Sequence, residues 1–204
     1  MTFVKHPRGR RSLTARPVVS VAIMLSLAIG MQGCAPGSKL APLPPATSTG
    51  YVLGPSDQIR VITYNEPQLT NSFTVGDNGT IAFPLIGTVH AAGMAANDVA
   101  ATIATALVQK KLLSDPSVSV EITQYRPIFV LGEVTHPGQY PYQPGMTMLS
   151  GVALAGGFTY RAVTGYAGAV RSQGEEAGHA IEGKIGRATY LQPGDVITIY
   201  ERYF

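Results

Sequence analysis

Short runs in which apolar and polar residues alternate constrain the fold of this 204-residue chain more than any other feature. In one of them, Val118, Val120 and Ile122 alternate with Ser, Glu and Thr side chains. Successive side chains of a strand point to opposite faces of a sheet, so this alternation predicts strands with one buried face. Similar runs at residues 59–64 and 196–204 follow turns that contain Pro or Gly. The chain is therefore predicted to be rich in short strands.

Two segments depart from this pattern and favour helices. Asn97 is predicted to cap a helix that runs to about Leu113, because apolar residues recur there at helical spacing. Thr147 is predicted to cap a shorter helix that stops at Gly156 and Gly157. One helix beside each group of strands predicts an α+β fold, with two small, mostly antiparallel β modules that each carry one packed helix.

The sequence Asp77-Asn78-Gly79 is a strong turn signal between two strand-like runs. Asn-Gly supplies the positive φ angles that a tight turn requires. We expect this turn to join residues 73–75 and 80–83 as a hairpin. No catalytic or phosphate-binding pattern accompanies it, so its predicted role is structural.

Pro137-Gly138 is predicted to form the turn of a second hairpin, which starts from a strand at residues 128–130. The segment that follows the second helix, residues 166–187, is rich in Gly, Ala and charged residues. Only residues 169–171 within it have the pattern of a strand. The rest is expected to be irregular.

One internal similarity joins the two halves of the chain. LGPSDQIRVITY, which contains Asp57, parallels LQPGDVITIYER, which contains Asp195. Each stretch has Leu, a turn with Pro, an Asp and then a β-rich run. An aspartate at this place can accept hydrogen bonds from turn amides, so Asp57 and Asp195 are predicted to stabilise turns and not to act in catalysis.

The first 33 residues have the composition of an export signal. Five basic side chains and no acidic one accompany an apolar run at residues 18–29, which is too short to span a bilayer. IGMQGCAPG then resembles a bacterial lipobox, which predicts a lipid on Cys34, the single cysteine. Ala35 permits sorting to the outer membrane, whose lipid the acyl chains would enter. The apolar run suits the general secretory route, and Arg10-Arg11 also permits the twin-arginine route.

Removal of residues 1–33 changes the charge of the chain. Five of the 15 Lys and Arg residues and none of the 12 Asp and Glu residues are lost, so ten positive and twelve negative side chains stay. A nucleic-acid-binding surface needs clustered positive charge, and the mature chain is therefore not predicted to bind nucleic acid. Residues 34–50, rich in Pro, Ser, Thr and Ala, are predicted to form a flexible tether after the lipidated cysteine.

Candidate catalytic or metal-binding residues are few. Outside the signal, His90, His136 and His179 lie in unrelated contexts without a partner at metal-ligand spacing. Glu175-Glu176 lies in a Gly-rich stretch and is expected to be solvated. A glycosidase could draw two carboxylates from separate places, but no pair stands out. We therefore predict no enzyme activity, no cofactor and no metal.

Several motifs in order resemble the family of bacterial outer-membrane polysaccharide export proteins, Wza- and GumB-like. YVLGPSDQIRV, VGDNGTIAFPLIGTV and AAGMAANDVAATI are similar to its export domain and place that domain at residues 51–125. VLGEVTHPGQYPYQPGMTMLSGVALAGGF is similar to a soluble-ligand-binding β-grasp (SLBB) domain and places it at residues 126–204. The usual Gly-Asp of the opening turn is Ser56-Asp57 here.

The resemblance implies a homo-oligomeric ring or channel on the periplasmic side of the outer membrane, with a capsular or secreted polysaccharide as cargo. It also implies an inner-membrane polysaccharide co-polymerase, often linked to a tyrosine kinase, as a partner. The sequence stops at Phe204 without the amphipathic C-terminal helix of longer members. We therefore expect a member of the short class, a lipid-anchored collar that works with a separate outer-membrane β-barrel.

Two other interpretations stay open at this point. Five tyrosines could stack on sugars in a monomeric periplasmic carbohydrate-binding module; they are Tyr140, Tyr142, Tyr160, Tyr166 and Tyr190. The aromatic C-terminal run could belong to a membrane barrel, but the strands are shorter than such a barrel needs. A closed ring would favour export, and a monomer with saturable glycan affinity would favour the binding module.

Overall fold

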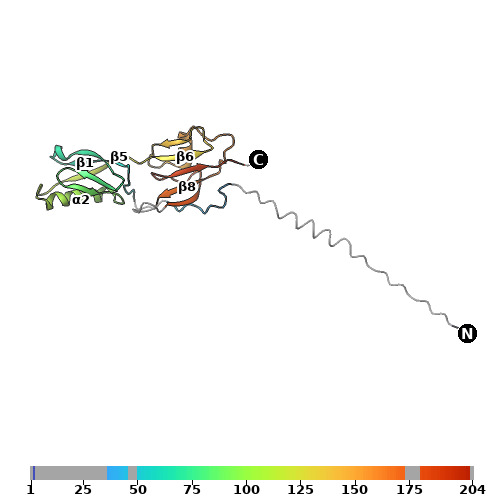
Figure 1. Ribbon diagram of the computed structural model, residues 1–204, viewed down its shortest axis with the longest axis horizontal. Helices are drawn as coiled ribbons and strands as arrows, with labels where there is room; N and C mark the ends of the chain where they lie inside the picture. The colour runs from blue at the N-terminus through green and yellow to red at the C-terminus, as the bar shows by residue number, and fades with distance from the viewer. Residues whose placement is uncertain (1, 3–35, 46–49, 173–179, 203–204) are drawn as a thin grey trace. The chain divides into compact units, whose positions relative to one another are not determined.

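The computed structural model describes residue 2 and residues 36–45, 50–172 and 180–202 (Figure 1). The chain divides into two compact units, Met1–Cys34 and Ala35–Phe204. The second unit holds every element named below. Cys34 and, apart from residue 2, the predicted signal segment lie outside the described residues.

The first module contains a three-stranded antiparallel sheet in the order β2-β1-β5 (Figure 1). Its elements are β1 (Gln58–Thr63), the 3₁₀ helix η1 (Pro67–Leu69), β2 (Asn71–Thr74) and β5 (Val118–Gln124). Ile59, Val61 and Thr63 of β1 are buried, whereas the residues between them are not. This is the alternation that the sequence predicts for a strand with one face toward the core.

β3 (Thr80–Phe83) and β4 (Gly87–His90) form a separate antiparallel pair. The predicted hairpin across Asp77-Asn78-Gly79 is therefore wrong in its pairing, because β2 pairs with β1 and β3 pairs with β4. The turn itself is present. Gly79 takes φ +75° and donates its amide to Gly76 O, and the Asn78 side chain accepts from Thr80 N at 3.2 Å.

α2 (Ala96–Gln109) packs against β4 and β5. The residues that it buries are Val99, Ala100, Ile103 and Leu107. The predicted cap at Asn97 is wrong, since the N-cap is Ala95 and no side chain caps the helix. The helix also ends before Leu113, because Lys111 takes the left-handed conformation at φ +56°.

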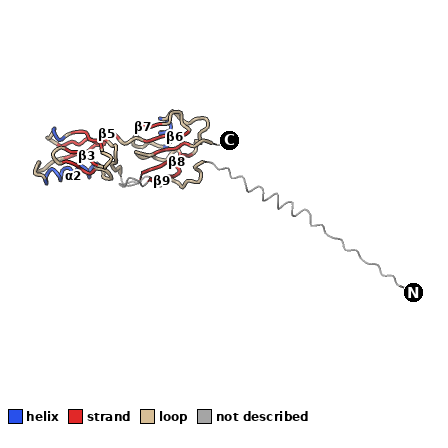
Figure 2. The backbone as a smooth tube through the Cα atoms, in the orientation of Figure 1, coloured by secondary structure: helices blue, strands red, loops and turns tan. Residues whose placement is uncertain are grey.

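The second module contains a five-stranded sheet in the order β7-β6-β10-β8-β9 (Figure 2). Its strands are β6 (Ile128–Gly132), β7 (Gly138–Tyr140), β8 (Tyr166–Ser172), β9 (Ala180–Gly186) and β10 (Val196–Ile199). All neighbours are antiparallel except β6 and β10, which run parallel. The predicted hairpin of β6 and β7 is present, but residues 133–137 form its loop and Gly138 begins β7.

α3 (Met148–Leu154) provides the helix of the second module. Thr147 is its N-cap, as predicted, and its side chain forms a capping box with Ser150. Gly156 and Gly157 follow the helix with φ +82° and +87°, conformations that glycine adopts without strain. With one packed helix beside strands in each module, the predicted α+β fold is confirmed.

Residues 166–187 contain much more strand than the sequence predicts. β8 and β9 each span seven residues and pair along their whole length. Gly168 and Gly183 lack side chains because other groups lie where a Cβ would be: the Tyr200 hydroxyl at Gly168 and the Leu43 backbone at Gly183. These glycines reflect close packing, not an irregular loop.

Residues 36–45 lie along the outer edge of β9, in contrast to the tether that their composition predicts. Leu43 donates to Lys184 O at 2.9 Å, and Lys184 donates to Ala41 O at 2.7 Å. The Leu43 side chain is 7% exposed and belongs to the core of the second module. This segment therefore adds hydrogen bonds to a sheet edge that would otherwise be open.

Candidate functional site

The Asp57 carboxylate organises the turn that opens β1. Its Oδ2 accepts a hydrogen bond from Gly54 N at 2.8 Å, while Asp57 N donates to Gly54 O at 3.2 Å. The Tyr51 hydroxyl donates to the same Oδ2 atom. Asp57 has no exposed surface, so these donors replace the water that a carboxylate normally binds.

Asp195 has the same arrangement in the turn that opens β10. Its Oδ2 accepts from Gln192 N at 2.8 Å, and Asp195 N donates to Gln192 O at 3.1 Å. Asp195 is also fully buried. Both aspartates thus accept a hydrogen bond from the backbone amide three residues earlier.

Arg171 of β8 pairs with Asp195 through two hydrogen bonds. Arg171 Nε lies 2.9 Å from Oδ1, and Nη2 lies 2.7 Å from Oδ2. Nη2 also donates to Tyr190 O at 3.3 Å, and Nη1 donates to Pro44 O at 3.4 Å. The guanidinium, only 5% exposed, therefore connects β8, the Asp195 turn and the N-terminal segment.

Arg126 connects the two turns to each other. Its backbone amide donates to Asp57 Oδ1 at 2.7 Å, and its Nη1 lies 3.7 Å from Asp57 Oδ2. Its Nε donates to Pro193 O at 3.0 Å, within the Asp195 turn. The guanidinium lies directly over Gly54, where a Cβ would require it to move. Arg126 therefore ties the first module to the second.

Three tyrosines extend this junction. The rings of Tyr51 and Tyr125 meet edge-to-face with centroids 4.9 Å apart, and those of Tyr125 and Tyr142 do so at 5.6 Å. Burial, together with the hydrogen bond to Asp57, raises the pKa of Tyr51. Burial also raises the pKa of Tyr142. Asp57, Arg126, Pro193 and these tyrosines together form the junction between the modules.

The other predicted turn residues fall into two groups. Asp77, Asn78 and Gly79 lie in the first module, between β2 and β3. In the second module, Thr135 N donates to Gly157 O at 3.0 Å and His136 N donates to Ala155 O at 2.8 Å. The β6–β7 loop with Pro137 is thereby bonded to the turn at Gly156-Gly157. Sequence reasoning did not identify Arg126 or Arg171, because no local pattern indicates their partners.

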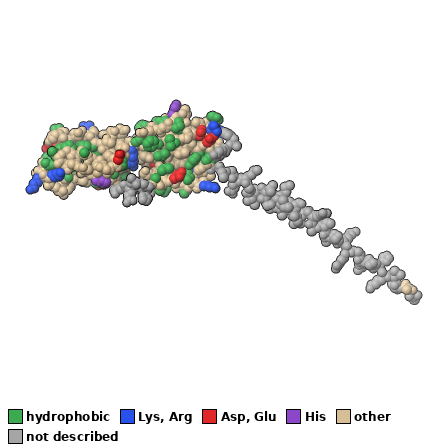
Figure 3. All heavy atoms as spheres, in the orientation of Figure 1, with side chains coloured by type: hydrophobic (Ala, Val, Ile, Leu, Met, Phe, Trp, Pro, Cys, Tyr) green, Lys and Arg blue, Asp and Glu red, His purple; other side chains and the backbone are tan. Residues whose placement is uncertain are grey.

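Within the described part of the chain, no group of three or more His, Cys, Asp or Glu residues could hold a metal ion. His179, Glu175 and Glu176 lie outside that part. No helix among the described residues is long and apolar enough to cross a membrane. On the face drawn in Figure 3, the Lys and Arg side chains are scattered and do not gather into one patch.

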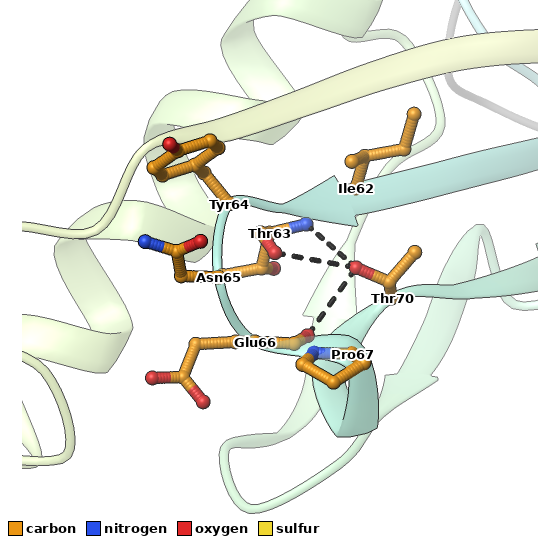
Figure 4. Close-up of a pocket in the computed structure, with 7 residues that line it drawn as sticks. All are labelled: Ile62, Thr63, Tyr64, Asn65, Glu66, Pro67 and Thr70. Atoms are coloured by element: carbon orange, nitrogen blue, oxygen red, sulfur yellow. Dashed lines mark hydrogen bonds between the residues drawn. The ribbon is translucent and has the colours of Figure 1, made fainter.

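A pocket of about 360 Å³ lies at the end of β1, in the first module (Figure 4). Its lining residues are Ile62, Thr63, Tyr64, Asn65, Glu66, Pro67 and Thr70. Tyr64 is 72% exposed, whereas Thr63 is buried. The pocket therefore combines an accessible aromatic ring with amide and carboxylate groups, none of which the sequence analysis singled out.

Comparison with known proteins supports the resemblance seen in the motifs. Residues 45–123 match the model of the polysaccharide biosynthesis/export protein family, and residues 127–174 match that of the SLBB domain. The chain is 33% identical over 160 residues to the exopolysaccharide production protein ExoF of Rhizobium meliloti, covering 73% of this chain and 37% of ExoF. It is 28% identical over 138 residues to the EPS I polysaccharide export outer membrane protein EpsA of Ralstonia solanacearum, and this match covers 55% of this chain and 36% of EpsA. The chain thus spans little more than a third of the length of these relatives.

Proposed function

Because the chain belongs to the polysaccharide biosynthesis/export protein family and carries an SLBB domain, we propose that it takes part in the export of a capsular or secreted polysaccharide across the outer membrane. The observation that carries this proposal is the succession of the two matched domains along most of the described chain. EpsA is named as an outer membrane export protein, which supports the same cell compartment. The role would be mechanical: the chain would form part of a passage and would not change covalent bonds.

The proposal includes a lipid anchor at Cys34. Several acyl chains on one cysteine bind a membrane stably, whereas a single chain does not. Two residues later, Pro36 O accepts a hydrogen bond from the Tyr166 hydroxyl at 2.8 Å, and the segment continues along β9. An anchor at Cys34 would therefore hold the second module close to the membrane surface.

The proposal also includes a homo-oligomeric ring around the cargo. A ring closes when two different faces of neighbouring subunits meet head to tail. The contacts of Arg126 with both turns support this assembly, because they would let the two modules act as one block. An inner-membrane co-polymerase with its tyrosine kinase, and a separate outer-membrane pore protein, would complete the path.

Deletion of the gene tests the export role. We expect polymer to collect in the periplasm while its synthesis continues, and the intact gene on a plasmid to restore secretion. Normal secretion by the deletion strain would overturn the role. The monomeric binding module would be favoured if native mass spectrometry found one subunit at every concentration.

Substitution of Cys34 by Ser tests the anchor separately. The variant should lose its mass shift from lipid and leave the outer-membrane fraction. Unchanged membrane retention of Cys34→Ser would overturn the anchor without affecting the export role.

A further inference from the structure

The pocket at the end of β1 presents three different side chains in one direction. Figure 4 shows the Tyr64 ring, the Asn65 amide and the Glu66 carboxylate projecting to the same side of the turn, away from Thr70. The ring is the more accessible part, because Tyr64 is 72% exposed. An exposed ring beside planar hydrogen-bonding groups offers one apolar surface and several donors and acceptors.

The backbone beneath these side chains is held in place. The Thr70 hydroxyl accepts from Thr63 N at 3.0 Å and lies 3.3 Å from the carbonyl oxygens of Thr63 and Glu66 (Figure 4). Tyr64 N donates to Ser117 O at 2.9 Å, and Asn65 takes the left-handed conformation at φ +59°. The three side chains therefore start from a fixed turn, which lowers the entropy lost when a ligand binds.

We propose that this pocket, the Tyr64 site, binds one neutral pyranose unit of the polysaccharide that the chain helps to export. The apolar face of the sugar would stack on Tyr64, and its hydroxyls would bond to Asn65 and Glu66. Glu66 would repel a uronic acid, which is why a neutral sugar is favoured. The inference rests on the proposed function and adds a cargo contact to it. An exposed site of this kind binds weakly, which suits a polymer that has to move on.

Binding is tested by NMR on the purified, ¹⁵N-labelled protein in detergent. The protein is titrated with cellotetraose or with tetragalacturonate at millimolar concentrations. Cellotetraose should shift the amide signals of residues 64–66, and tetragalacturonate should not. Tyr64→Ala should weaken cellotetraose binding about tenfold, the effect of losing a stacking contact. Tyr160→Ala is the matched control, because that ring is 79% exposed but lies in the second module away from the pocket.

Glu66→Gln provides a second variant that keeps the shape of the side chain. It should leave cellotetraose affinity within about twofold and allow tetragalacturonate to bind, since the repelling charge is gone. The proposal is overturned if the shifts fall elsewhere, if Tyr64→Ala and Tyr160→Ala bind equally, or if residues 64–66 shift with protein concentration alone. Shifts that depend on protein concentration alone would indicate that two copies of the chain contact each other at the pocket.

The same variants separate this inference from the proposed function in cells. In the deletion strain, the intact gene should restore secretion, Tyr160→Ala should do so fully, and Tyr64→Ala should restore it only in part. Full restoration by Tyr64→Ala would overturn the Tyr64 site and leave export intact. No secretion defect in the deletion strain would overturn the export role itself.

Discussion

Asp57 and Asp195 occupy equivalent positions in two turns that are 138 residues apart in the chain, and each accepts a hydrogen bond from the backbone amide three residues before it. They differ in the arginine that each one meets. Asp195 binds Arg171 inside one module, whereas Asp57 binds Arg126, which also reaches the other turn. The same local motif thus supports the core of the second module in one case and the connection between modules in the other.

Removing the charge of Asp195 should strongly destabilise the second module. Asp195→Asn leaves the guanidinium of Arg171 buried without its counterion, and we expect a loss of about 3–5 kcal/mol in the free energy of unfolding. Urea unfolding followed by circular dichroism measures it. The control is Glu201→Gln, which breaks the exposed pair with Arg161 and should cost less than about 1 kcal/mol. Equal losses would contradict the assigned role.

Truncation of Arg126 should loosen the junction between the modules. Arg126→Ala removes the bond to Pro193 O and the cation beside Asp57, so the modules should tumble more independently. ¹⁵N relaxation would then give shorter rotational correlation times for both sheets. Arg60→Ala, an exposed arginine on β1, is the control and should leave those times unchanged. Unchanged times in Arg126→Ala would show that other contacts hold the modules together.

Two glycines with nearly the same φ should respond differently to alanine. Gly132 has φ +84°, and a Cβ there would overlap Ile199 O of the paired strand β10. Gly87 has φ +89° with open space around it. Gly87→Ala should cost about 1–2 kcal/mol from the left-handed conformation alone. Gly132→Ala should cost clearly more, and thermal unfolding of the two variants tests this order.

Leu43 should hold the N-terminal segment on β9. Leu43→Ala removes a buried side chain and should cost about 2–5 kcal/mol. The amides of Leu43 and Lys184 should then exchange hydrogen faster, because the segment separates from the strand more often. Lys39→Ala, an exposed position in the same segment, should not change either exchange rate. Equal exchange in both variants would show that Leu43 does not hold the segment.

The protein should lose stability at alkaline pH through Tyr51. Burial and the bond to Asp57 raise the pKa of Tyr51 in the folded state above the ordinary value of about 10. The stabilisation is therefore fully present below that ordinary value and falls as the pH rises above it. Urea unfolding between neutral pH and about pH 11 should show this fall, and Tyr51→Phe should reduce its slope. An identical slope in Tyr51→Phe would rule out Tyr51 as the titrating group.

Local sequence patterns predicted many of the strands, helices and turns of this fold. Alternation identified β1, β5 and β10, and helical spacing identified α2. The cap at Thr147 and the stop at Gly156-Gly157 identified α3, and the repeated Leu-x-Pro-x-Asp pattern identified both aspartate turns. Each of these features is formed by residues that lie within a few positions of one another, so the interacting residues can be recognised in the sequence alone. The cap at Thr147 belongs to the same class, since its partner Ser150 is three residues away.

Several of the features that the sequence did not reveal depend on a distant partner. β2 pairs with β1 and β3 pairs with β4, and the turn signal at Asp77-Asn78-Gly79 between β2 and β3 did not reveal these partners. β9 has too many glycines to look like a strand, and only the approach of Leu43 explains Gly183. Arg126 and Arg171 find their aspartates 69 and 24 residues away, respectively. The sequence by itself thus determined which segments become strands, helices and turns, because local hydrogen bonds and side-chain periodicity decide those. Only the tertiary structure decided which strand edges pair and which charged side chains meet. A buried carboxylate or strand edge is costly without a partner, and that partner can lie anywhere in the chain.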